Sequence, residues 1–489
     1  MAPSLASQRF SLKSMHMSQR EAAIASRRFG LGAKPGDLAR IAPDPRGYVL
    51  AAVDDNQGAI VERIGLQPSH ASFVALRDAQ RAQREARAAA AMSGATSTEN
   101  AQSPSDAAEP PTVVPRPGQV RREVMQEEAA ARFEQAVNTD RPFLERLVLF
   151  WSNHFCVSAA KNPAVRVMAG AFEREAIRPH VLGRFADMLK AVEQHPAMLI
   201  YLDNQLSIGP NSQAGRNRAR GLNENLAREI LELHTLGVDG GYSQADVINL
   251  AKIITGWTVA NINQDRGLPG QFFFAKARHE PGPATLLGRS YEGAGLARGE
   301  AALGELARHP ATARHIARKL AIHFVSDNPP DALTTKLEAE FRHSDGDLSV
   351  VARALVSAPE VWQLPAKKIV PPYDFLISLH RAFGVHGQPN EALRLSAALG
   401  QPLWQPPSPK GWPDTDDAWT APSAIRERLR IAERWARDVN RSAALDPRAA
   451  ADDLFGGALS QETRQAVARA ETREQGLELL IMSPEFQRR

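Results

Sequence analysis

Residues 142–157 read PFLERLVLFWSNHFCV, a stretch in which apolar side chains follow one another almost without a break. On a helical wheel of about 100° per residue they cover nearly every direction, which predicts a central helix enclosed by other helices. His154 falls about 20° from Phe143, between Leu147 and Phe150. A polar side chain in this position is either a core histidine satisfied by a carbonyl or carboxylate, or a functional residue.

Helical periodicity continues on both sides of this stretch. Apolar residues three and four positions apart predict helices at 120–138, 142–157, 164–176, 179–193, 222–236, 244–257, 299–307, 311–325, 331–343, 347–357, 371–384, 389–398, 423–440 and 460–482. The best strand signal is Gly270–Ala275, where three Phe residues are expected to enter a short hairpin that continues through a turn at 286–288. The sequence therefore predicts an all-α fold, a single large multi-helical domain with one or two short β-ribbons.

The composition excludes several classes of protein and of binding site. The chain has 489 residues, of which 43% are hydrophobic and 23% are charged, as in globular proteins. No run of about eighteen uncharged apolar residues is present, so we expect no transmembrane segment. The net charge of +4 gives no reason to expect nucleic acid as a partner. The single cysteine, Cys156, excludes an internal disulfide and a thiolate-rich metal site.

Two segments depart from this composition. Residues 1–17 are polar and basic, and we expect a flexible leader before a domain that spans 18–489. A low-complexity insertion at 77–120 interrupts that domain: 77–90 is expected to form a solvated helix, and 92–118, rich in Ser, Thr and Pro, a disordered loop.

The segment from Gly221 to Gly237 reads GLNENLAREILELHTLG. Like the segment with His154, it places a polar residue on an apolar helix face. Leu222, Leu226, Ile230, Leu233 and Leu236 form one apolar stripe of the expected helix, and Glu229 falls inside it, so we expect this carboxylate to be buried. Such a carboxylate can belong to a structural network, a proton-transfer site or a metal site.

The polar neighbours of Glu229 have simpler interpretations as well. Asn225 and Glu232 lie along the same edge of the helix, whereas Glu224 and Arg228, four residues apart, are placed for an ordinary ion pair. His234 lies in the last turn, where it could serve only as a cap.

No motif with metal-ligand or phosphate-binding spacing is present. The Glu-x-x-His pattern of di-iron helices and the His-Glu-x-x-His pattern of zinc helices are both absent, as are a phosphate-binding glycine loop and a Gly-x-Ser-x-Gly elbow. A metal site would need a scattered set such as His154, Asp203, Glu229 and His279. We assign no cofactor.

Three loops contain polar or aromatic residues of the kinds found in functional sites. Tyr201-Leu202-Asp203-Asn204 leads toward the Asn223 helix, His279 lies in a tight turn, and the stiff segment 405–419 holds Trp412. The Trp residues could equally anchor that segment to the helical body. His315, Lys319 and His323, spaced four apart, are expected to form a solvated or interfacial helix face.

Several of these segments resemble the large bacterial family catalogued as domain of unknown function 1800 (DUF1800). The matching elements are Arg28-Phe29-Gly30-Leu31-Gly32, Trp151-Ser152-Asn153-His154-Phe155, Tyr201-Leu202-Asp203-Asn204, Asn223-Glu224-Asn225-Leu226-Ala227-Arg228-Glu229, His234-Thr235-Leu236-Gly237-Val238, Gly256-Trp257, His279, His309-Pro310, Lys319-Leu320, 406–412 and Ser483-Pro484-Glu485-Phe486. The resemblance covers about residues 20–489 and implies one helical domain with a variable insertion. It implies no particular activity.

The resemblance also bears on location and partners. Family members often look exported, and their genes often neighbour those of a second family, domain of unknown function 1501 (DUF1501), which is similar to alkaline phosphatases and sulfatases. This chain departs from the exported pattern because no signal peptide is seen, so the cytoplasm is favoured.

Two hypotheses of function remain. In the first, the chain is an enzyme acting on a polar or anionic substrate, with a glycan or cell-envelope component as one analogy. Its catalytic residues are expected to be His154, Glu229 and Asp203, and its substrate-binding residues Asn153, Asn223, Glu224, Asn225, Arg228, His234, His279 and Trp412. In the second, the same residues form a buried network in a non-catalytic helical partner or scaffold for another protein, such as a DUF1501-type one. The oligomeric state stays open.

Overall fold

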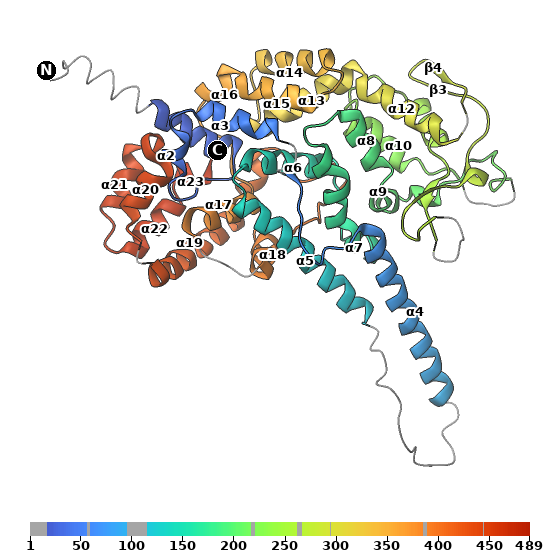
Figure 1. Ribbon diagram of the computed structural model, residues 1–489, viewed down its shortest axis with the longest axis horizontal. Coiled ribbons are helices and arrows are strands. Elements are labelled where there is room, and N and C mark those ends of the chain that lie inside the picture. Colours follow the sequence, from blue (N-terminus) through green and yellow to red (C-terminus); the bar gives the residue numbers. More distant parts are fainter. Residues whose placement is uncertain are drawn as a thin grey trace.

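The helices of this computed structural model form an elongated body from which one helical pair projects (Figure 1). The structure describes residues 17–55, 59–94, 115–216, 221–261, 267–293, 295–384, 389–443 and 445–489. The all-α prediction is confirmed, since helices alternate with only two small ribbons in these ranges. None of the described helices combines the length and the apolar character needed to span a membrane.

Helix α6 (Pro142–His154) lies at the centre, as its all-round apolar character predicts. Phe143, Leu147, Phe150 and Trp151 are buried in one continuous core with the helices around them. The helix ends at His154 rather than continuing to residue 157, and the chain then runs on in an extended course beside the loop at 404–412.

The remaining helices begin where the sequence supplies start signals. Proline occupies the first turn of many of them, because its missing N–H has no partner there in any case. The helices before the ribbons are α2 (Asp37–Ile41), α3 (Pro45–Ala51), α4 (Ser69–Gly94), α5 (Pro117–Asn138), α7 (Pro163–Phe172), α8 (Phe185–Glu193), α9 (Pro196–Tyr201), α10 (Asn225–Glu229) and α11 (Gln244–Ile253). After the ribbons come α12 (Leu296–Arg308), α13 (Pro310–Phe324), α14 (Asp331–His343), α15 (Leu348–Ser357), α16 (Pro359–Gln363), α17 (Pro372–Phe383), α18 (Pro389–Ala398), α19 (Pro422–Ala443), α20 (Pro447–Phe455), α21 (Gln461–Ala468), α22 (Arg473–Ile481) and α23 (Pro484–Gln487).

Some boundaries differ from the sequence-based ones. The helix expected over 460–482 is two helices, α21 and α22, and the helix expected over 244–257 ends at Ile253. Three helical segments contain a π turn, at Ala25–Phe29, Glu173–Ile177 and Ile230–His234. Short helices such as α2, α9 and α16 were not predicted, because one or two turns give too little periodicity to recognise.

The two ribbons are separate hairpins. β1 (Trp257–Val259) pairs with β2 (Phe272–Phe274), and β3 (Ala284–Leu286) pairs with β4 (Arg289–Tyr291), both antiparallel. The Phe triplet is therefore in a strand, as expected, but its partner is the segment before it rather than the 286–288 turn, which closes the second hairpin.

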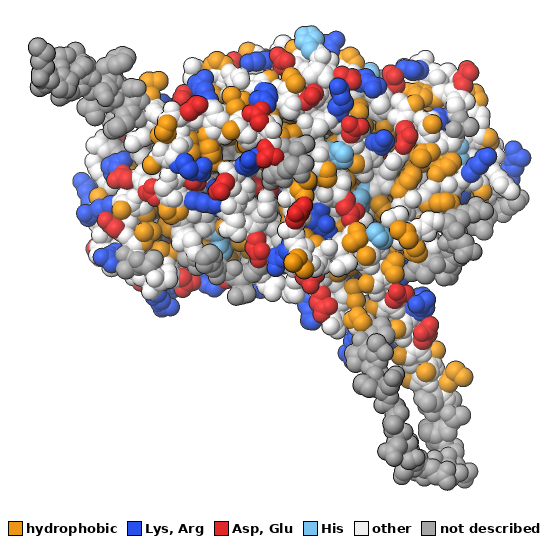
Figure 2. Space-filling view, viewed as in Figure 1, with side chains coloured by type: hydrophobic (Ala, Val, Ile, Leu, Met, Phe, Trp, Pro, Cys, Tyr) orange, Lys and Arg blue, Asp and Glu red, His pale blue; other side chains and the backbone are white. Residues whose placement is uncertain are grey.

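Helices α4 and α5 pack against each other and project from the body (Figure 1). The solvated helix predicted at 77–90 is the outer part of α4, whose side chains are mostly exposed beyond Arg81. Of the loop predicted at 92–118, residues 95–114 lie outside the described residues, as does the leader up to residue 16. Figure 2 shows charges of both signs interspersed over the face in view, as the small net charge implies.

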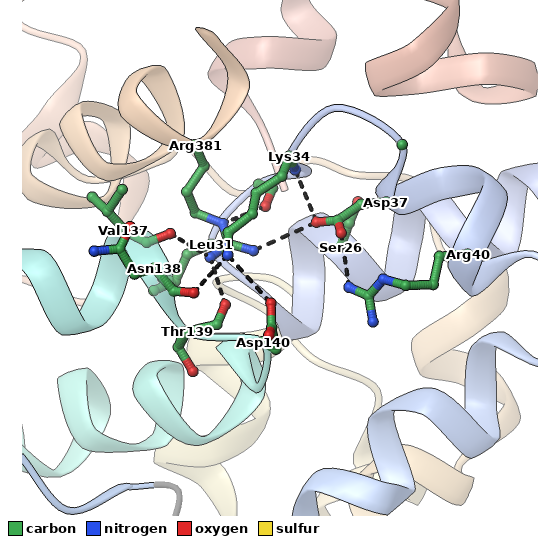
Figure 3. A network of polar contacts seen from close by, with 12 residues as sticks. Ser26, Leu31, Lys34, Asp37, Arg40, Val137, Asn138, Thr139, Asp140 and Arg381 are labelled. Carbon is green, nitrogen blue, oxygen red and sulfur yellow. Dashed lines mark hydrogen bonds and ion pairs between the residues drawn. The ribbon is translucent and has the colours of Figure 1, made fainter. Parts of the chain in front are cut away.

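A buried guanidinium ties the N-terminal segment to the end of α5 (Figure 3). Arg381 of α17 donates to the carbonyl oxygens of Gly32 (2.8 Å), Val137 (3.0 Å) and Thr139 (3.0 Å), and Asp37 lies 3.6 Å from it. Lys34 donates to the carbonyl of Asn138 at 2.6 Å. Val137, Asn138 and Thr139 lie at the end of α5, where a helix leaves its last carbonyls without partners. We call this set the Arg381 network.

Candidate functional site

The C-terminal end of α6 lies against residues 404–419, which we call the Trp loop. The Asn153 amide donates to the carbonyl of Trp412 at 2.9 Å, and the Trp412 N–H donates back to Asn153 Oδ1 at 2.7 Å. Gly411, at φ +85°, approaches so closely that an added Cβ would lie 2.5 Å from the Asn153 carbonyl oxygen. The two predicted residues Asn153 and Trp412 thus meet, and their contact pins the loop to α6.

His154 is buried behind this contact. Its Nε2 lies 3.2 Å from the carbonyl oxygen of His234, whereas its Nδ1 has no hydrogen-bond partner among the described residues. Burial lowers the pKa of His154 well below its usual value, with the charge of Lys319 adding to the effect. The imidazole is therefore neutral at physiological pH.

His234 forms the most enclosed ion-pair geometry of the region. Its Nδ1 lies 2.7 Å from Oε1 of Glu193, and both side chains are almost inaccessible to solvent. His234 Nε2 and Glu193 Oε2 have no hydrogen-bond partner in the described ranges. The Glu193 carboxylate accepts from His234 Nδ1 and so fixes the orientation of the ring.

The face of α13 that carries His315, Lys319 and His323 points toward this region. His315 Nε2 lies 3.1 Å from the carbonyl of Leu233, and Lys319 Nζ lies 3.4 Å from Asp414 of the Trp loop. The ring of His323 packs edge-on against Phe150 at 5.3 Å. Of the two expectations for this face, solvated or interfacial, the solvated one does not hold, because the α6 end and the Trp loop cover it. The six residues Glu193, His154, His234, His315, Lys319 and His323 are called the histidine layer below.

Glu229 stands at the edge of this layer and is half-buried rather than enclosed. The π turn at Ile230–His234 adds to the residues per turn, so Leu231 is buried and Leu233 partly exposed, unlike in the regular stripe expected from sequence. The Glu229 carboxylate makes no hydrogen bond or ion pair within the part of the chain that the structure describes. Burial raises its pKa above the usual value; the charges of Glu232 and Glu193 add to the rise, and those of His234 and Arg228 oppose it.

The other predicted residues of this segment are engaged locally. Arg228 donates to Glu224 at 3.1 Å and to the side chain of Gln244 at 3.0 Å. Asn223 Oδ1 accepts from the N–H of Asn225 at 2.9 Å, which organises the start of α10. These contacts shape the helix and its surface.

Asp203 and His279 have side-chain partners outside the histidine layer. Asp203 pairs with Lys161 at 2.6 Å, and both side chains are about one-third exposed. His279 Nδ1 lies 2.8 Å from the carbonyl of Thr255, and its Nε2 accepts from Arg298 at 2.9 Å. Their roles in catalysis and substrate binding stay predictions.

The described residues were compared with the ligand geometry of metal sites. Among the described residues, no group of three or more His, Cys, Asp or Glu side chains is placed to hold an ion, and the scattered set His154, Asp203, Glu229 and His279 is not brought together.

A cavity of about 100 Å³ adjoins the histidine layer. Residues of α5, α6, α7 and α17 and of the Trp loop form its walls, and Asn153, Trp412 and His323 are among them. Cys156 also lines it, and burial raises the pKa of this thiol to about 12, so it is protonated at neutral pH.

Sequence reasoning missed several of these groups. Glu193 ends a predicted helix and looks like an ordinary surface carboxylate until α10 is folded against it. The four-residue spacing of His315, Lys319 and His323 was a usable signal, since it places three titratable groups on one face.

Comparison with known proteins gives one family. The family model described as "Protein of unknown function (DUF1800)" matches residues 24–488. Searches of curated proteins and of solved structures return no match.

Proposed function

Since the chain belongs to the DUF1800 family, whose description leaves its activity open, we propose that it is an enzyme in which Glu229 exchanges protons with a polar or anionic substrate. The observation that carries this proposal is the state of the Glu229 carboxylate. It is accessible, has no partner within the described residues, and has a pKa raised by burial, which suits a group that must both hold and release a proton.

The π turn supports this role for Glu229. In a π turn the backbone bonds join residues five apart, which brings positions i and i+5 toward the same face. Glu229 and His234 have this spacing across Ile230–His234, and their charges interact. Such turns occur frequently at functional sites.

The Glu193–His234 pair lies behind Glu229 as a positioning element. Glu193 fixes the orientation of the imidazole through the 2.7 Å contact with Nδ1. His154 holds the carbonyl of His234 from the other side and so supports the π turn. In this proposal Glu229 touches the substrate. His154, His234 and Glu193 do not touch it and serve to position Glu229.

Tyr201 completes the surroundings of Glu229. Burial raises the pKa of this phenol, with smaller contributions from Cys156 and Glu229, so it remains protonated. A protonated phenol beside a proton-transferring carboxylate can donate a hydrogen bond to a substrate oxygen.

The experiment compares Glu229→Gln with Glu232→Gln on chromogenic ester, amide, glycoside and phosphoester panels. Glu232 lies three residues further on the same helical segment and is similarly half-buried, which makes it a matched control. We expect a turnover that Glu229→Gln reduces by at least about 100-fold and that Glu232→Gln leaves within about threefold. Turnover that Glu229→Gln does not change would contradict the proposal, as would its absence from every panel.

A second candidate function, a non-catalytic partner of another protein, is favoured by the projecting α4–α5 pair. Arg81, Arg84 and Arg87 are exposed on α4, away from the body (Figure 1). A DUF1501-type protein is the partner proposed. Replacing the three Arg residues with Glu should abolish its co-purification with this chain, and unchanged co-purification would reject the arm as the contact.

A further inference from the structure

Arg132 of α5 carries a buried guanidinium with unused donors. Its side chain is 8% exposed, and its Nε donates to Glu173 at 2.7 Å. Its amino end lies near Tyr373, whose hydroxyl forms a hydrogen bond with Arg132 that opposes the burial-driven rise in the pKa of that phenol. The guanidinium lies 4.7 Å from the ring centre of Tyr373 and 5.6 Å from that of Trp404, so two aromatic rings hold it in place.

Trp404 is held in a conformation that a bulky residue rarely adopts. Its φ is +51°, in the left-handed region, and its carbonyl accepts from the N–H of Ala159 at 2.7 Å. Such backbone strain persists where the surroundings impose it, and it concentrates at functional and ligand-binding sites. Here it brings the indole against Arg132 at the wall of the 100 Å³ cavity.

Arg489 supplies a second set of unused donors at the same cavity. Its side chain is 3% exposed, and its Nε and Nη1 make no hydrogen bond with any described residue. Its Nη1 lies 3.5 Å from Asp374. An unpaired buried donor costs free energy, and a ligand acceptor would remove that cost.

The carboxylates of the cavity wall already have cations of their own. Glu173 is shared by Arg132, at 2.7 Å, and Arg178, at 2.9 Å. Asp374 pairs with Arg146 at 3.0 Å. Asp416 lies 3.5 Å from Lys368. The local charges are therefore balanced, and what the wall still offers is a surplus of hydrogen-bond donors beside aromatic rings.

We propose that this cavity binds the carboxylate of a small organic acid, with the acid's apolar part against Trp404 and Trp412. A guanidinium that is held through Nε and has donors left at its amino end matches a carboxylate in geometry as well as charge. A volume of about 100 Å³ is smaller than the roughly 150 Å³ that holds one benzene ring, so the cavity suits a short acid of about four to six non-hydrogen atoms, such as butyrate. The inference concerns binding alone and does not rest on proton transfer at Glu229.

The test uses acetate, butyrate and benzoate, each beside its own amide, titrated into the full chain by calorimetry and followed by tryptophan fluorescence. At least one acid is expected to bind saturably and at least about tenfold more tightly than its amide, because the amide keeps the shape and loses the charge. This comparison needs no variant. Absence of saturable binding by all three acids, or amides that bind as tightly as acids, would overturn the proposal.

Arg132→Lys keeps the charge and loses the paired amino groups. We expect it to weaken acid binding by at least about tenfold. Arg174→Lys is the control, since Arg174 also pairs with a buried glutamate, Glu128, at 2.9 and 2.6 Å, and lies away from the cavity wall. A loss of binding that is equal in the two variants would show that Arg132 acts only through the fold.

Discussion

The Arg381 network and the histidine layer are both built from buried polar groups, but their atoms are paired to different degrees. In the network of Figure 3, Arg381 donates from Nε and Nη1 to carbonyl oxygens, and Asp37 accepts from Lys34 and Arg40. In the histidine layer, His154 Nδ1, His234 Nε2, Glu193 Oε2 and His323 Nε2 lack partners within the described ranges. Complete pairing is what a structural network needs, whereas unpaired atoms are a cost that stability alone does not explain.

Removing the central guanidinium of the paired network should have the largest effect on stability. Arg381→Met would leave the carbonyls of Gly32, Val137 and Thr139 without a donor and Asp37 with one cation fewer. We expect the free energy of unfolding to fall by about 3–5 kcal/mol, measured by urea denaturation. A loss below about 1 kcal/mol would show that the network is not structural.

The histidine layer should make the protein sensitive to mild acid. Burial, with Lys319 adding, lowers the pKa of His315 to about 4. Between about pH 6.5 and 4 the unfolded chain therefore binds a proton that the folded chain does not, so stability falls as pH falls. His315→Gln should remove about 1–3 kcal/mol of that loss, measured as the difference between unfolding free energies at pH 7 and 4.5. An unchanged pH dependence would contradict the burial of this imidazole.

Replacing Asp203 tests whether a predicted site residue outside the histidine layer contributes to stability. Its ion pair with Lys161 is about one-third exposed, and such pairs contribute little. Asp203→Asn should lower the free energy of unfolding by at most about 1 kcal/mol. A loss of several kcal/mol would place Asp203 in a network that these contacts do not reveal.

Glu229→Gln should have the smallest effect on stability. The raised pKa means that the fold disfavours the charged form, so an uncharged amide should be tolerated at neutral pH. We expect the free energy of unfolding to stay within about 0.5 kcal/mol of the original, or to rise slightly. A clear decrease would assign Glu229 a structural role and weaken the proposed function.

Much of the fold could be predicted from residue spacing, because burial follows periodicity. The apolar faces around α6 placed His154 in the core without any knowledge of its neighbours. Glu229 shows the limit of this reasoning. The helix begins only at Asn225 and continues into a π turn at Ile230–His234, so a wheel of constant pitch over 222–236 does not describe it, and the carboxylate is half-buried.

The site was predicted only in part because its contacts join distant segments. Asn153 and Trp412 were both selected from sequence, but their mutual hydrogen bonds depend on how the Trp loop returns to α6. The Glu193–His234 pair and the Arg132–Trp404 contact likewise join residues far apart in the chain. Local sequence patterns do not indicate which distant residues will meet in the fold.

His154→Phe, compared with Arg381→Met in the same urea titration, tests most directly whether the histidine layer is kept for function rather than for stability. The rings of Phe150, Trp151 and Phe155 already surround His154, so an apolar ring should fit there and should remove the unpaired Nδ1. We predict that the free energy of unfolding stays within about 1 kcal/mol of the original or rises. A decrease of about 3–5 kcal/mol, equal to that of Arg381→Met, would show that both sets of buried polar groups are structural and would contradict the account.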